Sequence, residues 1–127
     1  MSVEIIKANN SYSEAQYSDK KIFVFDNRFQ NRETTDTAVV YGGLVCRKSA
    51  GIVEAATSDN LEKVIGISAS NVETSGVLAY VTKGTVYENN LTFPGGVTLD
   101  TLIGETGLTL KDKLEDLGFH LEFADIN

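Results

Sequence analysis

The middle of the chain alternates short apolar runs with polar, glycine-containing turns. Runs of roughly five to eight residues, repeated about every 8–12 residues, are typical of strands in a β-sandwich or β-barrel. The second run is expected to return antiparallel to the first after a turn at 47–51. The four runs are residues 39–46, 52–56, 63–70 and 77–82.

The run "VLAYVT" at 77–82 is apolar on both of its alternating faces. A strand of this kind is covered on both sides, so we predict a central strand here. Gly84 permits a tight reversal, which predicts a hairpin with a half-exposed strand at 85–89. Pro94 lacks the N–H that a sheet ladder needs, so we expect it to end the sheet. In an earlier run, Gly66 predicts the close approach of another backbone.

The N-terminal part of the chain has a different pattern. Residues 1–20 are rich in Asn and Ser, with one short apolar cluster, and this composition predicts an arm that precedes the folded domain. The apolar stretch "KIFVF" at 21–25 predicts the first strand. Residues 26–37 are polar apart from Phe29 and are predicted to be an exposed loop.

The C-terminal third changes to helical spacing. Apolar residues at i, i+3 and i+4 predict a short helical turn at 98–105. The clearest helix is predicted at 109–118. Thr109 is a good N-cap, Asp112 stands at the capping-box position, and Gly118 suits the residue that follows a helix.

A final strand is predicted at 119–123. Its alternation places Phe119, Leu121 and Phe123 inward and His120 and Glu122 outward. The whole pattern predicts a mostly-β fold with one or two short helices, as a barrel or sandwich that ends in a helix and a strand. We expect an arm at 1–20 and a single β-rich domain at 21–127.

Charge and length narrow the classes of partner. The 127 residues are enough for one domain. Residues 1–48 carry seven basic and six acidic groups, whereas residues 49–127 carry four and twelve. An acidic body repels phosphate, so we expect no nucleic-acid partner. No apolar run approaches the roughly 20 residues of a membrane span, and residues 1–16 lack a signal-peptide core. We therefore expect synthesis in the cytoplasm and no membrane partner.

Candidate chemistry is sparse. His120 is the only histidine and Cys46 the only cysteine, and neither has a metal-binding or nucleophilic partner at a recognisable spacing. Arg47 and Lys48 could lower the pKa of the Cys46 thiol, although a small buried hydrophobe is a commoner role for a lone cysteine. The glycines have no phosphate-loop spacing. We therefore predict that the protein is not an enzyme and holds no cofactor and no metal.

The order of strands and turns in residues 42–94 resembles a known family. A glycine-led strand and short hairpin come first, and a "VIGI" strand follows a polar loop. The hairpin "SGVLAYVTKGTVYE" comes next, with an aromatic-Pro stop at Phe93 and Pro94. This order resembles the lambda-type head decoration proteins of tailed bacteriophages, which stabilise the capsid.

The resemblance implies a β-tulip-like domain that assembles as a trimer on the outer face of a virion capsid. The implied partners are the major capsid protein and further copies of the chain, at three-fold and quasi-three-fold positions of the expanded shell. The implied arm contacts with the capsid are Val3, Ile5, Ile6, Tyr12 and Tyr17. The implied subunit-interface residues are Tyr80, Tyr87, Phe93 and Pro94.

Two alternatives remain open from the residues. One is a small β-sandwich that recognises carbohydrate or a host surface, for which Tyr12, Tyr17 and Tyr87 are the candidate stacking residues. The other is an enzyme, which would require a cleft with convergent polar groups. A glycan array distinguishes the first alternative from a capsid-binding protein.

Overall fold

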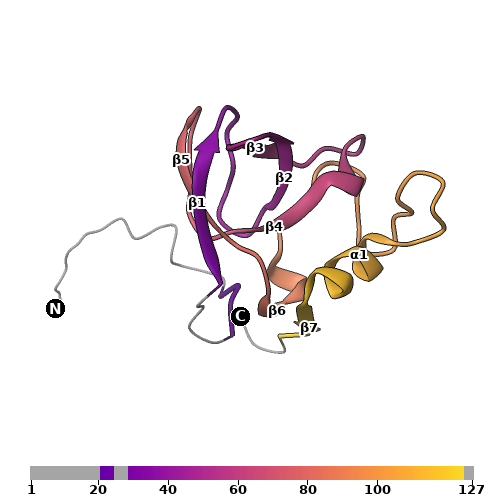
Figure 1. Cartoon of the computed structure of the whole chain (residues 1–127). Helices are drawn as coiled ribbons and strands as arrows, with labels where there is room; N and C mark the ends of the chain where they lie inside the picture. Colours follow the sequence, from indigo (N-terminus) through magenta and orange to yellow (C-terminus); the bar gives the residue numbers. More distant parts are fainter. Residues whose placement is uncertain (1–20, 25–28, 125–127) are drawn as a thin grey trace, which may run out of the picture.

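A five-stranded closed barrel forms the main body of the protein (Figure 1). The computed structural model describes residues 21–24 and 29–124. Around the barrel the strands are ordered β1-β3-β2-β4-β5, with β1 and β3 parallel and the other neighbours antiparallel. The strands are β1 (Gln30–Thr35), β2 (Leu44–Ser49), β3 (Ile52–Ala55), β4 (Val64–Ser68) and β5 (Gly76–Val81).

A smaller layer lies against one side of the barrel. It contains strand β6 (Gly84–Tyr87), strand β7 (Phe119–Glu122) and helix α1 (Leu110–Leu117). β6 and β7 are parallel, and Phe23 forms an antiparallel bridge to Val86 on the other side of β6. Two short 3-10 turns complete the described elements, η2 (Leu61–Lys63) and η3 (Glu88–Asn90). The predicted mostly-β fold, with a C-terminal helix and strand, is confirmed.

Two apolar cores explain why several strands are apolar on both faces. In β2, Val45 packs inside the barrel, whereas Leu44 and Cys46 pack into a second core shared with α1, β6 and β7. In β5, Tyr80 faces the barrel interior and Val81 faces the second core. β5 pairs with both β1 and β4, so the predicted central strand is confirmed. The second core lies between the outer side of the barrel and helix α1, which covers this side.

Strand β1 was missed by the hydrophobic pattern, since residues 26–37 were predicted to be an exposed loop. Residues 30–35 instead pair along their whole length with β5. The pattern fails because the inward positions are polar: Glu33 bonds to buried Tyr80, and fully buried Thr35 bonds to Thr37. Hydrogen bonding replaces apolar contact at these positions.

The predicted hairpin between 77–82 and 85–89 is also wrong. β5 already has strands on both edges, so Gly84 directs the chain out of the barrel. Its φ of 140° is a conformation that favours glycine. β6 then pairs in parallel with β7, about 35 residues further along the chain.

Four further segments differ from the sequence prediction. Residues 98–105 form turns and no helix, because positive φ angles at Gly104 and Gly107 shape a tight loop. The strand expected at 39–46 begins only at Leu44 and continues to Ser49. The strand expected at 119–123 ends at Glu122, and Phe123 is 66% exposed instead of inward. Residues 21–24 form only the single bridge at Phe23, and residue 25 lies outside the described part.

The caps predicted for helix α1 are present in the structure. The Thr109 side chain accepts a hydrogen bond from the Asp112 N–H, and the Asp112 carboxylate accepts one from the Thr109 N–H. This reciprocal pair lowers the pKa of the Asp112 carboxyl through its bonds to Thr109. Gly118 follows the helix in the left-handed conformation. In the described part of the chain, no helix has the length and apolarity to cross a membrane.

Candidate functional site

The arm residues predicted to contact a capsid lie outside the part of the chain that the structure describes. These are Val3, Ile5, Ile6, Tyr12 and Tyr17. Their role stays a prediction. The structure does describe Lys21, the residue that follows the predicted arm.

The four predicted subunit-interface residues have different environments. Tyr80 is fully buried inside the barrel, so its side chain serves the chain's own core and its assignment to an interface is wrong. Tyr87 at the end of β6 is half-buried. Phe93 is half-buried and packs against the second core, and Pro94 beside it is also half-buried. These three residues keep part of their surface open to a partner.

Both ends of the described chain are held by two neighbouring asparagines of η3. The Asn90 side chain donates to the carbonyl oxygen of Lys21 at 2.9 Å. The Asn89 side chain donates to the Ala124 oxygen at 3.0 Å and accepts from the Ala124 N–H at 2.8 Å. We call these residues, together with Ile22, the terminal junction.

The terminal junction fixes the backbone at Lys21, the first residue that the structure describes. Asn90 is only 5% exposed, so its amide is an almost buried polar group that the Lys21 carbonyl satisfies. Ile22 adds a backbone bond, because its oxygen accepts from the Tyr87 N–H at 2.8 Å. The sequence analysis missed both asparagines, which look like ordinary loop residues. Their position at the end of the strand predicted at 85–89 was the only available signal.

A second polar cluster closes one part of the barrel interior. The Tyr80 hydroxyl donates to Glu33 Oε2 at 3.0 Å, and Arg47 forms a two-pronged ion pair with the same carboxylate. The hydrogen bond from Arg47 is the main cause of the lowered pKa of the Glu33 carboxyl. Burial is the main cause of the raised pKa of the Tyr80 hydroxyl. Each group is satisfied by the others, so the cluster is structural and leaves no group aimed at a substrate.

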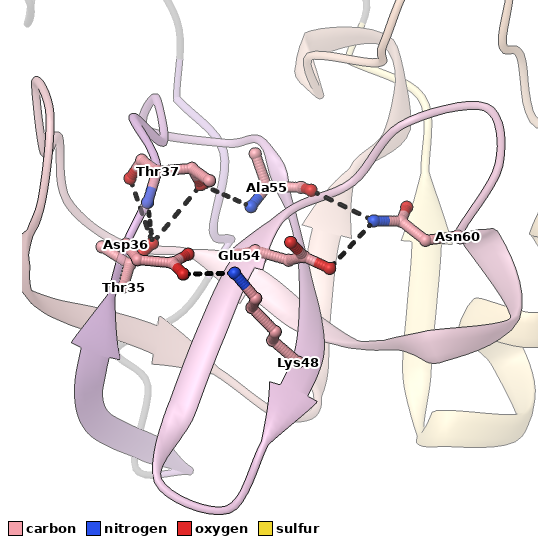
Figure 2. Close-up of polar contacts among 7 residues, drawn as sticks. All are labelled: Thr35, Asp36, Thr37, Lys48, Glu54, Ala55 and Asn60. Carbon is pink, nitrogen blue, oxygen red and sulfur yellow. Dashed lines mark hydrogen bonds and ion pairs between the residues drawn. The ribbon is translucent and has the colours of Figure 1, made fainter.

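A third set of polar contacts ties the ends of the strands together (Figure 2). Thr37 Oγ1 accepts from the Ala55 N–H at 2.9 Å and so links the end of β1 to β3. Asn60 donates to the Ala55 oxygen and to Glu54, which links the 57–60 turn to the same strand. These side chains bond to one another rather than converge on an open site. The residues drawn are Thr35, Asp36, Thr37, Lys48, Glu54, Ala55 and Asn60.

Cys46 is a core residue rather than a reactive thiol. It is fully buried, and its thiol donates to the Asn60 carbonyl oxygen at 3.3 Å. Burial, followed by the nearby carboxylates of Glu54 and Glu62, raises the pKa of this thiol to about 12. Arg47 and Lys48 do not lower it as the sequence suggested, because both pair with carboxylates of the β1 region.

Cys46 is therefore expected to react with iodoacetamide more than about a hundredfold more slowly in the folded protein than in denaturant, at about pH 8. The alkylated fraction is followed by mass spectrometry over time. The urea-unfolded chain is the control for reagent activity. Equal rates in the two states would show that the thiol is accessible in the folded protein.

His120 lies on the open face of β7, as predicted. Its side chain is 70% exposed and lies 3.4 Å from Glu122 Oε2. In the described part of the chain, no group of three or more His, Cys, Asp or Glu side chains is placed to hold a metal ion. Tyr87 is the only one of the three candidate stacking tyrosines that the structure describes.

Comparison with known proteins adds no assignment. No protein-family model matches the chain, and no curated protein matches its sequence.

Proposed function

We propose that the protein is a structural component of a bacteriophage virion that binds the outer surface of the capsid and stabilises the expanded shell. Its partners in this proposal are the major capsid protein and two further copies of the chain, arranged as a trimer at three-fold and quasi-three-fold sites. The resemblance in residues 42–94 supports the proposal, and the mostly-β barrel is compatible with it.

The observation that carries the proposal is the terminal junction. An arm that holds a domain on a surface needs a fixed root, because a loosely attached arm would leave the domain free to move. Asn90 holds Lys21, and the Ile22 oxygen bonds to β6, so the arm starts from a folded point. Phe123, 66% exposed, directly precedes the held Ala124 and offers apolar surface beside this root.

The physical demands of such a role are modest for each copy. An arm can bind by adding a strand to an exposed sheet edge, where backbone hydrogen bonds give affinity and alternate side chains give specificity. In an extended arm, Val3 and Ile5 would share one face and Ile6 the other. Each apolar side chain would contribute about 1.5–3 kcal/mol before the cost of ordering the arm. Many copies on one lattice then add avidity.

Deleting residues 2–12 is expected to leave the melting temperature and the oligomeric state nearly unchanged while sharply weakening attachment to capsids. The reason is that residues 2–12 are mostly polar, whereas the two apolar cores of the described residues are built from Ile22 onward. Attachment is measured by co-sedimentation with expanded, DNA-free capsids and by electron microscopy of the pellets.

A triple substitution of Val3, Ile5 and Ile6 by serine tests the apolar contacts alone, and its matched control replaces Asn9 and Asn10 by serine. We expect loss of attachment only in the first variant. Equal decoration by the truncated and full-length chains would show that the arm is not the clamp. Failure of the full-length chain to bind any expanded capsid would overturn the proposed function itself.

A further inference from the structure

The loop at residues 98–109 is a stiff projection with apolar side chains on its surface. It extends away from the barrel beside α1, as the orange loop in Figure 1. Ile103, 4% exposed, anchors it in the second core, and the Ile103 N–H donates to the Leu108 oxygen at 2.8 Å. The side chains of Thr101 and Thr106 bond to backbone groups inside the loop. We call this segment the 98–109 loop.

The 98–109 loop combines exposed leucines with acidic charge. Leu102 is 62% exposed and Leu108 is 44% exposed, and they are two of the six large apolar side chains exposed in the described part of the chain. Its charged residues are Asp100 and Glu105, and the loop contains no basic residue. A loop held in shape by its own hydrogen bonds loses little entropy when it binds. These features are those of a preformed contact element.

The outer face of β1 and β5 has the complementary character. Asn31 and Glu33 pair with Tyr80 and Leu78, which face the barrel interior, so the alternate residues face outward. These outward residues include Arg32 opposite Ala79 and Thr34 opposite Val77. Val77 is 65% exposed, and within the described residues Arg32 forms no ion pair. We call this surface the β1–β5 face.

We propose that the 98–109 loop of one copy docks on the β1–β5 face of a second copy of this chain. Charge complementarity favours a second copy as the partner of this face. The 98–109 loop is acidic and apolar, while the β1–β5 face presents Arg32 and the exposed Val77. Leu102 supplies the apolar contact to Val77, and Glu105 supplies the carboxylate for Arg32.

The two surfaces differ and lie on opposite sides of the molecule, with β1 and β5 on the left and the loop on the right in Figure 1. Contact between two different patches is heterologous, so each copy gives its loop to one neighbour and receives a loop from another. Such contacts produce a closed ring when the rotation between copies closes, and an open filament when it does not. In a ring of three the two patches of each copy lie on adjacent sides, so patches on opposite sides extend the contact into an open chain or a large ring.

Charge reversal tests this contact in the purified protein. The Arg32→Glu and Glu105→Arg variants are each expected to weaken self-association by roughly tenfold or more, because like charges then face each other. The double variant carrying both substitutions restores opposite charges in every contact and is expected to regain association. Mass is measured by light scattering after gel filtration over a range of concentrations, and circular dichroism verifies the fold of each variant.

A matched control reverses a charge elsewhere on the exposed surface, at Lys63, and is expected to leave association unchanged. Leu102→Ser tests the apolar contact independently and is expected to weaken association. A wild-type chain that stays monomeric at the highest concentration would overturn the inference, as would a double variant that stays as weak as the single ones. The inference goes beyond the proposed trimer, because it joins copies through a separate contact. Its test needs no capsid, so failure of capsid binding is a separate result.

Discussion

Replacing Gly66 with alanine is expected to lower the free energy of unfolding by roughly 3 kcal/mol or more. Gly66 lies in β4 where the backbone of β5 passes very close. A methyl group at this position would clash with the carbonyl oxygen of Val81 and lie 2.9 Å from Cδ2 of Tyr80. The carbonyl belongs to a paired strand and cannot rotate away, so the barrel itself would have to open. Urea denaturation followed by circular dichroism measures the loss.

Gly95→Ala is the matched control for this substitution. Nothing lies within 4 Å of the methyl group that it would add, and Gly95 does not have a positive φ. We therefore expect the control to unfold at nearly the same urea concentration as the wild type. If Gly66→Ala were as stable as Gly95→Ala, β4 and β5 would not approach each other as closely as the structure shows.

Replacing Tyr80 with alanine is expected to cost about 3–5 kcal/mol of stability, the range for large aromatic residues in protein cores. Among the residues that the structure describes, Tyr80 is the largest fully buried side chain, and it fills the barrel interior beside Val45 and Val53. Its removal would leave a cavity that the strands of a closed barrel cannot easily fill by moving together. Thermal and urea unfolding both report the change.

Tyr80→Phe separates the ring from the hydroxyl in the same experiment. The phenylalanine variant keeps the ring but loses the hydrogen bond to Glu33, while Arg47 still pairs with that carboxylate. We expect a cost of only about 1 kcal/mol, the net value of a typical hydrogen bond. Equal losses in the two variants would show that the hydroxyl, and not the ring, holds the barrel together.

The elements that could be predicted from the sequence are those whose signals are local. The caps of α1 at Thr109 and Gly118 depend on neighbouring residues, and the central position of β5 follows from its two apolar faces. The close approach at Gly66 was also predicted from one residue in an apolar run.

The missed features depend on partners far away in the chain. Strand β1 is polar because Glu33 is satisfied by Tyr80 and Arg47, and no pattern within β1 shows this. The parallel pairing of β6 with β7 joins segments separated by the whole 98–109 loop and α1. The terminal junction joins Asn90 to Lys21 across 69 positions of the sequence. The place where Lys21 is held was therefore not predicted from the sequence, and the role of the arm residues stays a prediction.

The terminal junction also determines how the domain responds to mechanical force. A pull along the arm would enter at Lys21 and reach the antiparallel pairing of residues 22–24 with β6. There the Ile22 oxygen accepts from Tyr87 and the Val24 N–H donates to Thr85 at 3.0 Å. Bonds that lie side by side across a pulling direction share the load and must break together. Tension that enters at Lys21 would therefore reach β6 first and pass through Val86 into the second core, before it acts on the pairing between the barrel strands.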